Sequence, residues 1–135
     1  MIERREFAST PASAGEARRF VDAVMADADL EHLAYTATML VSELVTNAIL
    51  HTGTPLTVVV ARHGDRVRIE VHDGSPQLPV RKHYSDMSGT GRGLMLVDRM
   101  AATWGSDRTA DGKVVWFELD GSLAPAFDIL GVDAL

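Results

Sequence analysis

The sequence predicts a two-layer α/β (α+β) sandwich, with helices packed on one face of a mixed, mostly antiparallel sheet. Three observations carry this prediction. The expected order of elements is strand, helix, helix, strand, strand, loop, helix, strand, strand, which lacks the strict alternation of a doubly wound parallel sheet. Two stretches before the central strands have apolar residues at spacings of three and four, as amphipathic helices do. The central strands are separated by a short turn, which favours an antiparallel hairpin.

The N-terminal part is predicted to form one short strand and two helices. Residues 2–8 make the strand. Ser13 is the expected N-cap of the first helix, because Glu16 follows it at the spacing of a capping box. The second helix is expected to begin near residues 29–31 and to end before Gly53, since glycine is a common C-terminal stop.

The C-terminal part is predicted to form strands around one long loop and one helix. Residues 56–62 are rich in β-branched side chains, and residues 66–73 alternate polar and apolar side chains. Together they predict a β-hairpin with one solvent-exposed face. Residues 74–93 have no periodicity and predict a long functional loop. A helix, a weak strand and a final strand follow at residues 94–101, 106–109 and 113–119. Trp104-Gly105 is expected to end that helix.

Composition excludes several classes of protein. A chain of 135 residues can bury a core without cross-links, and the absence of Cys excludes disulfides, thiol nucleophiles and cysteine-ligated zinc. The net charge of −6 argues against nucleic-acid binding. No signal peptide or apolar stretch of transmembrane length is recognisable. We therefore expect a cytoplasmic domain at residues 1–120, followed by a tail at residues 121–135 that is partly ordered or partner-dependent.

The first candidate functional feature is a polar pair on the second predicted helix. Glu43 and Asn47 are four residues apart, so an α-helix places them on one face, with His51 one turn further on. Both lie off the apolar stripe, and such a pair could be plain solvated surface. It could also supply an amide oxygen ligand to Mg²⁺ and a carboxylate base. The pair alone leaves both alternatives open.

Two further candidate features follow the hairpin. Asp73 ends a predicted strand beside Gly74, and most such acids are structural. A buried carboxylate there could instead accept a hydrogen bond from an exocyclic amine such as that of adenine, with Gly74 leaving room for the ring.

The other feature is the run Gly89-Thr90-Gly91-Arg92-Gly93-Leu94, which leads into a helix. A helix N-terminus offers free N–H groups to phosphate, and Arg92 adds a guanidinium group. A flexible loop before a helix is the alternative. The run matches neither a Walker A loop nor a Rossmann fingerprint.

The order and spacing of these three features resemble the GHKL ATPase superfamily, the group of gyrase, histidine kinases and MutL. The shared motifs are Glu-x-x-x-Asn on a helix, Asp-x-Ser-Pro after a strand, and Gly-x-Gly-Arg-Gly-Leu opening a helix. Further runs resemble the stand-alone anti-sigma-factor serine/threonine kinases, particularly actinobacterial ones. These runs are Glu43-Leu44-Val45-Thr46-Asn47-Ala48 with His51, Gly91-Arg92-Gly93-Leu94, Trp104-Gly105 and Gly112-Lys113-x-Val115-Trp116-Phe117. The similarity spans roughly residues 7–119.

The resemblance implies a Bergerat-type sandwich that holds ATP between its helices and a mobile lid at residues 77–90. It implies that Asn47 coordinates Mg²⁺, that Glu43 is the catalytic base and that Asp73 binds the adenine amino group. The expected nucleotide-binding residues are Asn47, Asp73, Gly74, Gly89, Thr90, Gly91, Arg92, Gly93 and Leu94. His51, Trp104 and Trp116 also match the family pattern, and we expect them to have structural roles.

The chain departs from the superfamily pattern at two places. Ser75-Pro76 stand where a further glycine is usual. Lys113 stands where many members have a Thr near the adenine, so the resemblance leaves the details of base recognition open.

The function implied by the resemblance is that of an anti-sigma factor with serine/threonine protein kinase activity. It would transfer the γ-phosphate of ATP to an anti-sigma-factor antagonist. The implied partners are a sigma factor and the antagonist, with no direct nucleic acid or membrane contact, and family habit favours a homodimer. The alternative is a catalytically weak or inactive ATP-binding module that only sequesters a partner. A histidine-kinase catalytic domain or gyrase-like ATPase is disfavoured, because both normally need more chain.

Overall fold

The computed structural model describes residues 1–75 and 89–122, and for residues 89–93 it describes the backbone only. The predicted elements occur in the predicted order. They are β1 (Ile2–Phe7), α1 (Ala12–Asp27), α2 (Glu31–His51), β2 (Leu56–His63), β3 (Arg66–Asp73), α3 (Gly89–Met100), β4 (Thr103–Arg108) and β5 (Lys113–Asp120). The lid expected at residues 77–90 lies almost entirely outside the described residues, as does the tail at residues 123–135.

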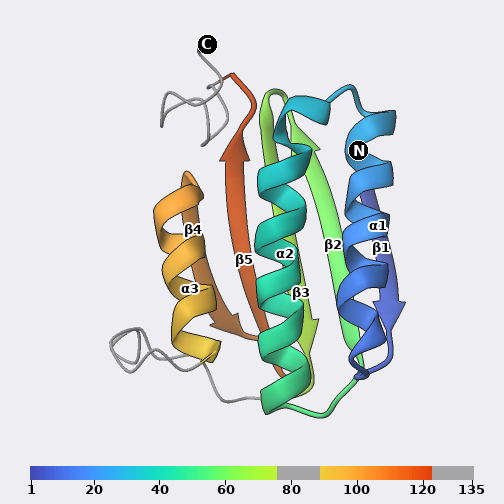
Figure 1. The fold of residues 1–135 in the computed structure, drawn as a ribbon, viewed down its shortest axis with the longest axis vertical. Helices are drawn as coiled ribbons and strands as arrows, with labels where there is room; N and C mark the ends of the chain where they lie inside the picture. Colours follow the sequence, from blue (N-terminus) through green and yellow to red (C-terminus); the bar gives the residue numbers. More distant parts are fainter. Residues whose placement is uncertain (76–88, 123–135) are drawn as a thin grey trace.

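The sheet has the strand order β1-β2-β3-β5-β4. Each of the neighbouring pairs in it is antiparallel. The three helices lie on one face of this sheet, with α2 in the middle between α1 and α3 (Figure 1). The predicted fold class is confirmed, and the described pairings are antiparallel throughout rather than mixed.

The core lies between the helices and the inner face of the sheet. Alternate residues of each central strand point toward the helices, as the period of two requires. The fully or nearly fully buried strand residues are Leu56, Val58, Val60, Val67, Ile69, Val71, Val115, Phe117 and Leu119. Burying a side chain as large as Phe117 contributes about 2 kcal/mol by transfer free energy, so this layer dominates the stability of the domain.

Helix α2 is the central helix of the core, and its composition corrects one expectation. It is 21 residues long and, by length and composition alone, apolar enough to cross a membrane. The sequence had predicted no stretch of that kind. Packing accounts for part of this apolar character, since Leu40, Val41 and Val45 are completely buried in the core, whereas Leu50 is 64% exposed.

The expected N-cap of the first helix is wrong. Helix α1 begins at Ala12, with Pro11 as the N-cap residue and no side-chain cap. The ring of Pro11 already holds the backbone dihedral φ that a helix needs, so the helix starts earlier than the capping box suggested. Ser13 is buried inside the first turn, and its hydroxyl donates a hydrogen bond to the carbonyl of Ala8.

The boundaries around the third helix also differ from expectation. Helix α3 begins at Gly89, within the run expected to be loop, and Trp104 and Gly105 lie in β4 rather than ending the helix. Pairing with β5 places Gly105 directly opposite Trp116. A Cβ atom on Gly105 would approach the Trp116 ring to 2.7 Å, so the glycine leaves space for the ring and is not a helix terminator.

Candidate functional site

The predicted site residues belong to elements that meet at one end of the molecule. The C-terminal end of α2, the end of β3, the start of β5 and the N-terminus of α3 all lie at this end (Figure 1). Helix α2 contacts β3, β5 and α3. The fold therefore brings the helical pair Glu43 and Asn47, the strand-end acid Asp73 and the first turn of α3 into one region.

Asn47 is buried, although the sequence placed it off the apolar stripe. Its exposed fraction is 9%, and Glu43 one turn earlier is half-buried, whereas Thr46 between them is exposed. The residue is thus mostly enclosed, although its amide atoms are not among the buried unpaired polar atoms of the described chain. Asn47 is therefore not an ordinary solvated surface residue, and an amide that keeps some access to solvent could also contact a ligand.

Asp73 forms a buried ion pair across the β3–β5 ladder. It lies directly opposite Lys113, and the Lys113 Nζ atom is 3.0 Å from Oδ2 and 3.1 Å from Oδ1 of Asp73. The side chains of Asp73 and Lys113 are only 2% and 10% exposed. The backbone N–H of Ser75 donates a further hydrogen bond of 2.8 Å to Oδ1. The orientation of the Asp73 carboxylate is thus fixed from two sides.

Close backbone packing holds this pair in register. A Cβ atom on Gly112 would lie 2.0 Å from the carbonyl oxygen of Asp73 and 2.7 Å from the backbone of Gly74, so no larger residue fits there. The N–H of Gly74 donates to the Thr54 hydroxyl at 2.8 Å, which ties the end of β3 to the segment after α2. Sequence reasoning noted Lys113 as a departure but missed its pairing with Asp73. The pairing depends on the register of β3 against β5, two strands that the long loop, α3 and β4 separate in the sequence.

The Gly-rich run contributes the start of a helix. Helix α3 begins at Gly89, so the N–H groups of its first turn lie at the same end of the molecule as Asp73. The side chains of Gly89, Thr90, Gly91, Arg92 and Gly93 lie outside the described residues. The side chain of Leu94 is 2% exposed and belongs to the core, so a ligand here could contact only its backbone.

A family profile described as "Histidine kinase-like ATPase domain" matches residues 7–119. The chain belongs to this family. The match runs from the end of β1 to the end of β5, so it includes the candidate site. Membership implies that the domain binds ATP. No curated protein matches the sequence.

A solved structure supports the same fold for this ATPase domain. It is the histidine kinase domain from the Erythrobacter litoralis EL346 blue-light activated histidine kinase, with a TM-score of 0.54 and 17% sequence identity. The similarity covers 82% of this chain and 60% of the other, so the chain spans somewhat less than two thirds of that structure's length. At this identity the likeness concerns the fold alone.

The donor groups of the ATPase domain fit a magnesium nucleotide. No group of three or more His, Asp or Glu residues in the described part of the chain could hold a metal ion by itself. Mg²⁺ in nucleotide sites is commonly held by one or two protein oxygens together with phosphate oxygens and water. A single amide oxygen at Asn47 beside the Glu43 carboxylate matches that requirement.

The two tryptophans that match the family pattern make structural contacts in this ATPase domain. Trp104 packs against the core and donates from Nε1 to Asp98 at 2.7 Å. Trp116 lies on the face of the sheet away from the helices, where the Arg68 guanidinium stands 4.0 Å from its ring centre. His51 is exposed at the end of α2.

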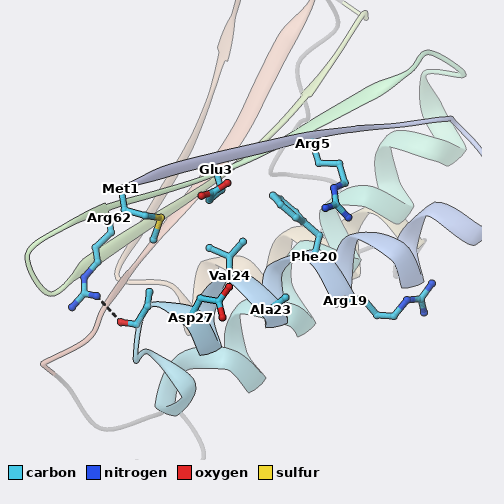
Figure 2. Close-up of a pocket in the computed structure, with 10 residues that line it drawn as sticks. Met1, Glu3, Arg5, Arg19, Phe20, Ala23, Val24, Asp27 and Arg62 are labelled. Carbon is cyan, nitrogen blue, oxygen red and sulfur yellow. Dashed lines mark hydrogen bonds between the residues drawn. The ribbon is translucent and has the colours of Figure 1, made fainter.

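A separate groove lies between β1 and α1 (Figure 2). Its volume is about 470 Å³, and its lining mixes Glu3 and Asp27 with Arg5, Arg19 and Arg62. The Arg62 guanidinium donates to the carbonyl of Ala28 at 2.6 Å across one end of it. None of the predicted site residues lines this groove, so it is separate from the nucleotide site.

Proposed function

We propose that this ATPase domain is an anti-sigma factor with serine/threonine protein kinase activity. It binds Mg-ATP at the end of α2, transfers the γ-phosphoryl group to an antagonist protein and sequesters a sigma factor in the cytoplasm. Family membership supports the ATP site. The sequence runs around Glu43, Asn47, Trp104 and Trp116 support the anti-sigma-factor branch. The observation that carries the proposal is the burial of Asn47 one helical turn from the half-buried Glu43.

Each proposed role follows from the chemistry of the side chain. The Asn47 amide oxygen would hold Mg²⁺ beside the phosphate oxygens, and the N–H groups at the start of α3 would face the phosphates. The Glu43 carboxylate would accept the proton of the attacking serine or threonine hydroxyl. A new bond would form between that hydroxyl oxygen and the γ-phosphorus while the bond from the γ-phosphorus to the bridging oxygen breaks, and ADP would leave.

The decisive test is phosphate transfer from labelled ATP to the physiological antagonist, which co-purification can identify. We expect transfer by the wild-type protein and a loss of about 10²- to 10⁴-fold in rate for Glu43→Ala, the usual contribution of a positioned base. Thr46→Ala is the matched control, because Thr46 is exposed on the same helix. A wild-type protein that binds Mg-ATP and the sigma factor but transfers no phosphate would establish the alternative, a module that acts by sequestration alone.

A second experiment addresses Asn47 alone. Asn47→Ala should abolish measurable Mg-ATP binding in isothermal titration calorimetry, while Thr46→Ala should bind as the wild type does. Undiminished magnesium-dependent binding by a folded Asn47→Ala protein would remove Asn47 from the metal site. The proposed catalytic role of Glu43 would then lose its geometric support as well.

A further inference from the structure

The ion pair of Asp73 and Lys113 differs from the other ion pairs of the sheet in where it lies. Those of Arg66 and Arg68 with glutamates lie on the face away from the helices, with side chains 23% to 47% exposed. Asp73 and Lys113 face the helices and are 2% and 10% exposed. Burying two charges costs desolvation that their attraction offsets only when the geometry is favourable, and an apolar pair often serves as well. Stability alone therefore does not explain an ammonium group at this position.

The contacts of the pair leave one hydrogen-bonding site on each partner. A carboxylate offers about four lone-pair sites and an ammonium group three N–H donors. The described contacts of Asp73 are the Ser75 N–H and Lys113 on Oδ1, and Lys113 on Oδ2. Lys113 has no described partner except Asp73. One acceptor site on Asp73 Oδ2 and one donor on Lys113 Nζ thus stand side by side, unused within the described part of the chain.

We propose that Lys113 donates to N1 of adenine beside the contact between Asp73 and the adenine amino group that the resemblance implies, so that Lys113 is a specificity-determining residue. This inference rests on the proposed ATP site. Adenine presents an amino donor at N6 next to a ring acceptor at N1, which complements an acceptor beside a donor. Asp73 Oδ2 accepts from the N6 amino group, and Lys113 Nζ donates to N1. Guanine presents an acceptor at O6 and a donor at N1, so in the same pose both contacts become repulsive.

The backbone around the pair supplies the rigidity that such recognition needs. Gly112 allows β5 to start against the backbone of Asp73 and Gly74, so Lys113 enters the ladder directly opposite Asp73. The backbone N–H of Ser75 donates to Oδ1 of Asp73 and so fixes the orientation of the carboxylate. A site built to hydrogen-bond a polar edge rejects analogues that lack the matching group, because its own buried groups are then left unpaired.

The test compares nucleotides that differ at single atoms of the base. Calorimetric titration of the wild-type protein with ATP, 1-deaza-ATP and GTP, each with Mg²⁺, needs no variant and so does not depend on a variant folding. 1-Deaza-ATP carries a C–H group in place of N1 and leaves the rest of ATP intact. We expect it to bind about 10- to 100-fold more weakly than ATP, the usual effect of losing a hydrogen bond to a charged group. GTP should bind more weakly still.

The variant Lys113→Met then tests whether the Lys113 side chain causes the difference in affinity between ATP and 1-deaza-ATP. The variant should bind ATP and 1-deaza-ATP equally, whereas Arg66→Met, which removes a cation from β3 on the opposite face, should discriminate as the wild type does. Wild-type protein that binds ATP and 1-deaza-ATP equally well would overturn the contact between Lys113 and N1. Preference for GTP would overturn the adenine assignment. Failure to bind any of the three nucleotides would overturn the proposed function itself. This outcome differs from equal binding of ATP and 1-deaza-ATP, which overturns only the role of Lys113.

Discussion

Replacing Gly112 by alanine should both destabilise the domain and disturb the nucleotide site. The new Cβ atom would lie 2.0 Å from the Asp73 carbonyl oxygen, against the 3.4 Å at which ordinary contact begins, so strands β3 and β5 would have to separate locally by roughly 1.4 Å. The atoms that block it are backbone atoms of Asp73 and Gly74, which cannot rotate away as a side chain could. Overpacking of this kind typically costs about 1–3 kcal/mol, and we expect the upper end of that range.

The matched control is Gly64→Ala in the β2–β3 turn. Gly64 has a φ of +60°, and no atom outside its two neighbouring residues lies within 4 Å of the position that a new Cβ atom would take, so its substitution tests backbone strain without a clash. Such strain costs about 1–2 kcal/mol. Urea unfolding followed by far-UV circular dichroism gives both free energies of unfolding, and calorimetry gives ATP affinity.

Gly112→Ala should therefore lose more stability than Gly64→Ala, and it alone should weaken ATP binding. The affinity should fall because the separation moves Lys113 away from Asp73. Equal losses of stability in the two variants would show that the start of β5 has room to adjust, and the close packing described at the nucleotide site would be refuted.

Two further predictions concern parts of the sheet away from the site. Phe117→Ala should lower the free energy of unfolding by about 3–5 kcal/mol because it leaves a cavity in the core, while Leu50→Ala, at a side chain that is 64% exposed, should change it little; urea titration measures both. Burial raises the pKa of Glu70, but hydrogen bonds from Arg68 and His72 outweigh it, so its pKa lies below the ordinary value of 4.5. This stabilisation is present above the unfolded-state pKa and is lost as the pH falls through the lowered native pKa. Glu70→Gln should consequently show a shallower loss of stability below about pH 5 than the wild type, and an unchanged slope would contradict the role of these bonds.

The order and type of the elements could be predicted because they depend on neighbouring residues. Apolar residues recur every three or four positions along α1 and α2 and every second position along β3, so residues close together in the sequence are enough to recognise these elements. The boundaries were less predictable, because pairing partners decide them. Gly105 has the features of a helix terminator in the sequence, but it lies in β4 opposite β5, where the glycine makes space for the Trp116 ring.

The candidate site could be predicted in part for the same reason. Glu43 and Asn47 are four residues apart on one helix, so helical geometry alone placed them together. The burial of Asn47 depends on what packs over α2, and no local pattern encodes that. Ser13 shows in the same way that a local sequence pattern does not determine a side chain's contacts. Its hydroxyl donates to the carbonyl of Ala8 and does not cap the helix.

The sequence by itself determined the fold class, the family and the identity of the polar groups, because periodicity and motif spacing are local properties of the chain. Only the tertiary structure decided that Asp73 has Lys113 as its partner. These residues are forty positions apart, and the register of β3 against β5 alone brings their charges to 3.0 Å in a nearly dry environment. A register of that kind is the joint outcome of the whole sheet, the close approach at Gly112 and the core beneath it.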